Sequence, residues 1–179
     1  MQVTVSSGNN INGTLVLPLF EGSQTITDNA EGVPMALKSQ INRVLNNGDF
    51  KGKANSVMSL YGAEGGKAIL VGLGKEEKSD IHSYREAGAT VVAQHKSSHD
   101  SELTVVFHTS DVPAITAFAE GMMMRDYKYD IYKKAEDDDE KAPLTARINC
   151  NEGDASALTL AIDRASAVVS GVHLSRDLG

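Results

Sequence analysis

The sequence has few cysteines, no long apolar run and little positive charge, and each shortage excludes a class of protein. Cys150 is the one cysteine among 179 residues, so an internal disulfide is impossible. No stretch approaches the roughly 18 apolar residues that cross a bilayer, and no cationic segment followed by an apolar run begins the chain as a signal peptide would. These shortages favour a reducing, cytoplasmic location.

Positive charge is also in the minority. The chain has 24 acidic and 17 basic residues, which gives a formal net charge of −7. Such a chain repels nucleic acid phosphates and anionic lipid headgroups, so we expect neither nucleic acid nor a membrane among its partners. With 41% hydrophobic and 23% charged residues, the composition is typical of one globular domain.

Apolar strand segments alternate along the chain with segments of helical periodicity. Strands are expected at 3–5, 15–20, 56–60, 68–73, 103–107 and 144–148. Helices are expected to begin near Pro34, at Ser79 or Asp80, at Ser110 or Asp111, and at Asp154. This alternation predicts a three-layer α/β/α fold with a mixed, largely parallel sheet. The first two strands are expected to be neighbours, and they could form an antiparallel edge of the sheet.

The last helix has the clearest pattern. From Asp154, apolar residues recur every three or four positions over more than four turns: Ala155, Leu158, Ile162, Ala165, Val169 and Val172. A stripe of this length must be covered, so we expect its first half to pack on the sheet domain. We expect residues 172–178 to fray or to pack on a second copy of the chain.

Two glycine clusters have incomplete phosphate-binding spacing. Gly72 and Gly74 follow a strand, as in a dinucleotide fingerprint, but Glu77 occupies the third glycine position and would repel a pyrophosphate. Gly66 and Lys67 resemble the end of a phosphate loop, but they precede a strand. We interpret the first cluster as a strand-end turn.

No group of residues has convincing metal-ligand or nucleophile spacing. His95 and His99 stand four apart, but no glutamate follows His95, and we interpret both as surface histidines at a frayed helix end. The acidic run 136–140 lacks the glycine of a calcium loop, so we expect a solvated loop there. No serine lies in a G-x-S-x-G elbow. We therefore assign no catalytic, cofactor-binding or metal-binding residue.

Two further features are interpreted as packing. His173 lies beside the apolar stripe near the end of the last helix. The run 122–124 consists of three methionines at helical spacing beside Phe118, which is typical of a core or an interdomain contact.

A string in the second half of the chain carries a family resemblance. Residues 119–133 read A-E-G-M-M-M-R-D-Y-K-Y-D-I-Y-K. They resemble the E-G-x-x-L-x-x-Y-x-F-D-x-Y-K pattern of the leucyl aminopeptidase (cytosol aminopeptidase) family, with Met124 for leucine and Tyr129 for phenylalanine. The runs 15–22, 68–75, 85–91 and 170–179 are similar to the same family in the same order.

The resemblance implies a two-domain metalloexopeptidase of the cytoplasm, usually a hexamer, that releases N-terminal residues, preferably leucine, from peptides. Its N-terminal domain is similar to macro domains. Its catalytic lysine, its arginine and its metal ligands lie beyond the R-D-L segment, here 176–178, and its N-T-D-A-E-G-R-L motif is absent from this chain. The two divalent metal ions, zinc or manganese, would therefore belong to a catalytic domain that the chain lacks.

On this reading, residues 1–150 form the N-terminal macro-like domain and 151–179 form a connector helix. We expect the 179-residue chain alone to be inactive, to meet peptide substrate only through the missing catalytic domain, and to be a monomer or a weak dimer. One alternative is a macro-type module that binds ADP-ribose or a related nucleotide, in which Gly72 and Gly74 open onto an anion pocket of backbone N–H groups. Another is an interaction domain with no ligand.

Overall fold

Strands and helices alternate along the chain, as the hydrophobic pattern predicts. The computed structural model describes all residues except 9, 27–31, 63–65, 96–99, 128–141 and 179. The strands are β1 (Gln2–Ser6), β2 (Thr14–Phe20), β3 (Val57–Tyr61), β4 (Lys67–Gly74), β5 (Glu102–Val106) and β6 (Thr145–Asn149). The helices are α1 (Met35–Asn46), the short 3-10 helix η2 (Glu76–Lys78), α2 (Ile81–His95), α3 (Val112–Arg125) and α4 (Glu152–Leu178). The acidic run 136–140 lies outside the described residues.

The described strands form one sheet in the order β1-β6-β5-β2-β4-β3. Every neighbouring pair in this sheet is parallel except β3 and β4, so the predicted mixed, largely parallel sheet is confirmed. The predicted pairing of the first two strands is wrong. β1 pairs with β6, with Gln2 opposite Thr145, whereas β2 lies between β5 and β4. The antiparallel edge is the β3–β4 hairpin.

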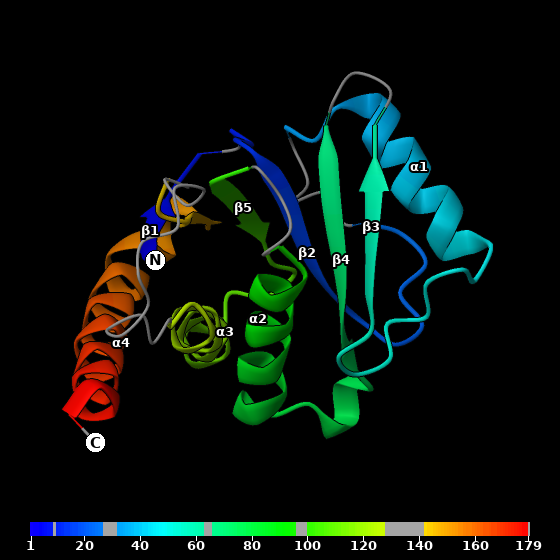
Figure 1. Ribbon diagram of the computed structural model, residues 1–179. Coiled ribbons are helices and arrows are strands. Elements are labelled where there is room, and N and C mark those ends of the chain that lie inside the picture. Colours follow the sequence, from blue (N-terminus) through cyan, green and yellow to red (C-terminus); the bar gives the residue numbers. More distant parts are fainter. Residues whose placement is uncertain (9, 27–31, 63–65, 96–99, 128–141, 179) are drawn as a thin grey trace, which may run out of the picture.

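Helices cover both faces of the sheet (Figure 1), with α1 on one face and α2, α3 and α4 on the other. Side chains of β2 alternate between the two cores because successive strand residues point to opposite faces. Leu15, Leu17 and Leu19 pack with α1. Val16 packs in the core under the other three helices. The predicted three-layer α/β/α arrangement is therefore present.

Two helix starts show how local sequence sets the element boundaries. Asp80 caps α2, since the Ser83 N–H donates a 2.8 Å hydrogen bond to Asp80 Oδ1. This bond lowers the pKa of the Asp80 carboxyl. Pro34 stands just before α1 with an extended backbone (ψ of 135°), where its missing N–H costs no helical bond.

α4 keeps one apolar stripe against the domain along its 27 residues. The buried residues of this stripe are Leu158, Ile162, Ala165 and Val169, all in the core that α4 shares with α3 and β1. The predicted packing of the first half of the helix is confirmed. The helix continues to Leu178, and the expected fraying of residues 172–178, or their packing on a second copy, stays a prediction.

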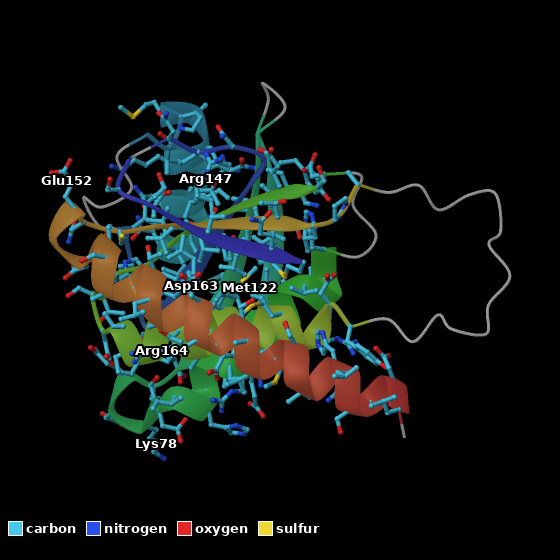
Figure 2. The ribbon with its side chains drawn as sticks, turned by 90° about the vertical axis from the view of Figure 1, so that its left-hand side faces the viewer. Lys78, Met122, Arg147, Glu152, Asp163 and Arg164 are labelled. Carbon is cyan, nitrogen blue, oxygen red and sulfur yellow. The ribbon has the colours of Figure 1, made fainter. Side chains whose placement is uncertain are left out.

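The outer side of α4 carries exposed apolar side chains, Leu160, Val168, Leu174 and Leu178, each at least half exposed. Asp163 and Arg164 also lie on the exposed part of the helix (Figure 2). By length and composition, α4 is the one helix of the described residues that is long and apolar enough to cross a membrane. The core helix of a globular protein passes the same test, and the buried stripe of α4 packs on the domain.

Candidate functional site

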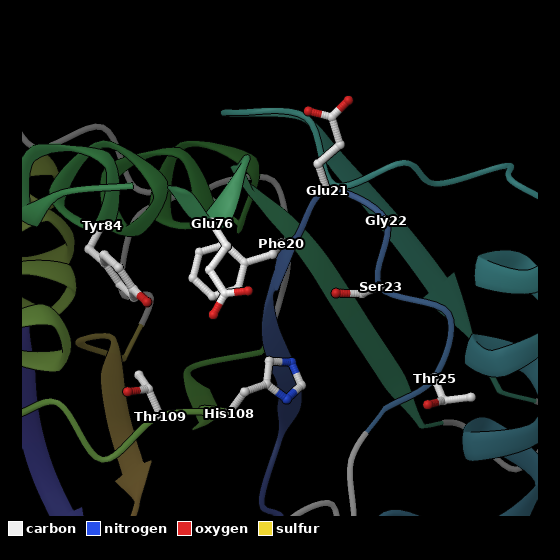
Figure 3. Close-up of a pocket in the computed structure, with 9 residues that line it drawn as sticks. All are labelled: Phe20, Glu21, Gly22, Ser23, Thr25, Glu76, Tyr84, His108 and Thr109. Carbon is white, nitrogen blue, oxygen red and sulfur yellow. The ribbon is translucent and has the colours of Figure 1, made fainter. Parts of the chain in front are cut away.

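A cavity of about 520 Å³ lies at the carboxyl ends of β2 and β5. Open α/β sheets bind ligands at this edge, and the volume is within the range of small-molecule sites. The loop after β2, η2, α2 and the loop after β5 all contribute to its wall (Figure 3). The lining residues are Phe20, Glu21, Gly22, Ser23, Thr25, Glu76, Tyr84, His108 and Thr109.

Several polar groups converge on this cavity. Figure 3 shows the Tyr84 hydroxyl and the Glu76 carboxylate directed toward the same space, with the Ser23 hydroxyl pointing toward them from the opposite side. The Phe20 ring forms an apolar wall and meets the Tyr84 ring edge-on, with 6.4 Å between centroids. The Glu21 carboxylate points away from the other labelled side chains.

The electrostatics of the cavity are negative. Burial raises the pKa of the Tyr84 phenol, and the carboxylates of Asp111 and Glu76 raise it further. Burial lowers the pKa of His108, although a hydrogen bond with the Pro18 backbone acts in the opposite direction. The imidazole is therefore neutral near pH 7. No lysine or arginine stands among the described lining residues.

The strand-end glycines do not form an anion pocket. The Gly72 N–H donates a 2.8 Å hydrogen bond to the Ser56 carbonyl, and the Gly74 N–H donates one of 2.9 Å to the Gly52 carbonyl. A Cβ on Gly72 would overlap the Lys53 carbonyl, so the loop before β3 covers this position. The interpretation as a strand-end turn fits Gly74, which has a φ of +81°. The pocket that the ADP-ribose alternative requires at these glycines is not formed.

The structure corrects the interpretation of one histidine. His95, the last residue of α2, is buried and only 3% exposed rather than on the surface. Its Nε2 lies 2.8 Å from the Asp100 carbonyl oxygen, which accepts a hydrogen bond and holds the ring inward. Burial lowers the pKa of His95. The second histidine of the predicted pair, His99, lies outside the described residues.

The part of the chain that the structure describes contains no candidate metal site. No group of three or more His, Cys, Asp or Glu side chains there is placed to hold a metal ion. Cys150, at the end of β6, is a half-buried free thiol whose pKa is raised by burial. His82 is exposed and pairs with Glu86 on the same helix, with 3.1 Å between Nε2 and Oε1.

The methionine run contributes to the core, as the helical spacing predicts. Met122 and Met123 are buried, and Met124 is half-buried against the same cluster. These side chains fill the space between α3 and its neighbours, so the core interpretation is confirmed and the run forms no open binding surface.

The family-like string around Glu120 forms a tight crossing between α2 and α3. A Cβ on Gly88 would overlap the Phe118 carbonyl, and a Cβ on Gly121 would overlap the Arg85 carbonyl. The two backbones approach closely because both positions lack a side chain. Beside them, both Nε and Nη2 of Arg85 donate to Glu120 Oε2, at 3.1 and 2.7 Å. The string therefore serves packing here.

A second contact joins the same string to the end of α4. The Tyr127 hydroxyl donates a 2.7 Å hydrogen bond to Asp177 Oδ1. His173 lies against the Tyr127 ring, with 4.9 Å between centroids, and the Arg176 guanidinium carbon lies 5.4 Å from the centroid of that ring. The predicted packing role of His173 is confirmed.

The cavity was not predicted from the sequence. Glu76, Tyr84 and Thr109 come from three elements and have no spacing in common. The one available signal is the position of polar residues after two inner strands, Ser23 after β2 and Thr109 after β5, because parallel strands end at the same edge of a sheet.

Sequence comparisons match the chain to one family. The model of the cytosol aminopeptidase family, N-terminal domain, matches residues 16–136. A probable cytosol aminopeptidase of Allorhizobium ampelinum is 35% identical over 179 residues, which covers 94% of this chain and 35% of that protein. A probable cytosol aminopeptidase of Rhizobium etli (strain CIAT 652) is 32% identical over 135 residues, covering 72% of this chain and 27% of that protein. The chain spans between about a quarter and a third of the length of these relatives.

Solved structures of low sequence identity share the fold. A tomato leucine aminopeptidase mutant superposes with a TM-score of 0.72 at 21% identity, covering 99% of this chain and 38% of that one. The bottromycin maturation enzyme BotP in complex with Mn superposes with a TM-score of 0.64 at 19% identity, covering 92% of this chain and 31% of that one.

Proposed function

Because the chain belongs to the cytosol aminopeptidase family and corresponds to its N-terminal domain, we propose that it is the non-catalytic domain of a metal-dependent aminopeptidase. The complete enzyme would release N-terminal residues, preferably leucine, from peptides. The observation that carries the proposal is the match of the family's N-terminal domain to residues 16–136, together with relatives about three times as long.

The described residues of this chain do not provide ligands for the metal ions of such an enzyme. The described residues offer no cluster of His, Cys, Asp or Glu that could hold a metal ion, whereas a two-metal site needs several convergent donors. The two divalent ions, zinc or manganese, would be held by a catalytic domain outside the chain. The Mn named for BotP belongs to that protein.

The role of α4 follows from its two sides. We assign residues 1–150 to the macro-like domain and 151–179 to a connector. The buried stripe fixes the helix to the domain, while Leu160, Val168, Leu174 and Leu178 remain exposed. Exposed apolar side chains that gather on one helix face are typical of an interaction surface. The connector would therefore place a catalytic domain in a fixed orientation. From the family, we also propose that the complete enzyme is cytoplasmic and assembles as a homohexamer.

The test is the reading frame of the source gene and its product. We expect the frame to continue past Gly179 into a metal-ligand domain, and the full product to release leucine from leucine amide with added manganese. A frame that ends at Gly179, or a longer product without metal-dependent release of N-terminal residues, would contradict the proposal.

A further inference from the structure

The cavity at the carboxyl ends of β2 and β5 has no part in the proposed peptidase chemistry. Three oxygen-bearing groups face the same space, namely the Glu76 carboxylate, the Tyr84 hydroxyl and the Ser23 hydroxyl (Figure 3). The fold brings Ser23, in the loop after β2, to the neighbouring elements η2 and α2, which carry Glu76 and Tyr84 much later in the sequence.

These groups match the hydrogen-bonding pattern of one chemical group. A primary ammonium ion has three N–H donors and no acceptor. The Glu76 carboxylate can accept from these donors, with the Tyr84 hydroxyl on one side of it and the Ser23 hydroxyl on the other (Figure 3), and the Phe20 ring supplies an apolar wall for the carbon body of such a molecule. We propose that the cavity binds a small organic ammonium ion, with the charged nitrogen at Glu76 and the carbon body against Phe20.

The charge distribution excludes the opposite ligand class. An anion such as a pyrophosphate would meet the Glu76 carboxylate and the nearby Asp111 carboxylate, with no lysine or arginine among the described lining residues to offset them. The nearby N–H groups of Gly72 and Gly74 already donate to carbonyl oxygens. A free amino acid also fits poorly, because its carboxylate would have no cationic partner in the described wall.

The experiment is an NMR titration of the 179-residue chain at pH 7 that follows the backbone amides. The probe is isopentylamine, and isopentyl alcohol serves as the neutral probe of the same shape. We expect saturable shifts at residues 20–25, 76 and 108–109 with the amine and no saturable shift with the alcohol. The variant Glu76→Gln should weaken amine binding by about fivefold or more, whereas Glu77→Gln, on the same 3-10 turn but outside the cavity, should change it less than about twofold.

Three results would overturn the assignment. One is the lack of saturable shifts at these residues up to about 50 mM amine, well above the millimolar range of weak ligands. Another is equal binding by the Glu76→Gln variant and the unaltered chain. The last is tighter binding of ADP-ribose than of the amine, which would restore the nucleotide alternative. The proposal goes beyond the peptidase assignment, and the first two of these outcomes leave that assignment unchanged.

Discussion

The Tyr127 hydroxyl and Asp177 Oδ1 lie 2.7 Å apart, although 50 positions separate the two residues in the sequence. The bond joins the string that resembles the family pattern to the R-D-L segment at the end of α4. Two of the strings by which the family is identified are therefore parts of one contact, which joins the distal end of the connector helix to the segment that follows α3.

Removal of this bond should loosen the end of α4. We expect Tyr127→Phe to lower the free energy of unfolding by about 0.5–1 kcal/mol, because the hydroxyl is lost and the ring contacts with His173 and Arg176 remain. Urea denaturation measures the change, and amide hydrogen exchange in residues 172–178 should rise. Tyr61→Phe, an exposed tyrosine of β3, is the control. Unchanged exchange in Tyr127→Phe would show that the bond does not hold the helix.

The crossing of α2 and α3 should tolerate no side chain at either glycine. We expect Gly121→Ala to destabilise the domain by roughly 2 kcal/mol or more, because its Cβ would overlap the Arg85 carbonyl and force the helices apart. Gly88→Ala should behave in the same way. Gly171→Ala in α4 is the matched control, since nothing lies within 4 Å of its Cβ, and it should stabilise the helix by up to about 1 kcal/mol. Equal melting temperatures for the two kinds of variant would refute the close crossing.

Packing of α4 on the domain gives a third prediction. Ile162 is 2% exposed, so we expect Ile162→Ala to cost about 2–5 kcal/mol through the cavity that it leaves. Leu160→Ala, on the exposed side of the same turn, should change stability by less than about 0.5 kcal/mol. Thermal and chemical denaturation of both variants measure the contrast. A neutral Ile162→Ala would mean that the helix is not docked on this domain.

Burial of His95 should make stability depend on pH. Its pKa is lowered in the folded chain, mainly by burial, from an ordinary value of 6.5. Below pH 6.5 the unfolded chain therefore binds a proton that the folded chain resists, so stability is fully present above this pH and falls as the pH drops. The loss should approach about 1.4 kcal/mol per pH unit for such a group, and His108 adds an effect of the same sign.

The measurement is the free energy of unfolding between pH 7.5 and 5.0. The variant His95→Gln keeps a donor for the Asp100 carbonyl but does not titrate, so it should flatten the slope. A slope in His95→Gln equal to that of the unaltered chain would show that this histidine does not contribute.

Local patterns predicted the elements well, since each depends on a short run of side chains. The stripe through Leu158 and Ile162 identified α4 and its buried face, and Asp80 was one of two predicted caps for α2. Strand order was not predicted, because the partner of β1 is β6, about 140 positions away, and no local pattern reports such a pairing. The error at His95 has a similar cause, as the Asp100 carbonyl that holds the ring inside lies in the following loop.

The candidate site was less predictable than the fold. The family strings proved to be packing contacts such as that of Arg85 with Glu120. The cavity depends on how two loops, η2 and α2 meet at one sheet edge. Glu76 and Tyr84 belong to no recognisable sequence motif, and only the fold brings them to the same cavity.

The most direct test of the central claim, that this chain is a non-catalytic domain, is an assay of the purified chain for leucine release from leucine amide with added manganese or zinc. We predict no release above the buffer rate, because the described residues provide no cluster of metal ligands. Metal-dependent release that disappears when a residue of this chain is substituted would contradict the account.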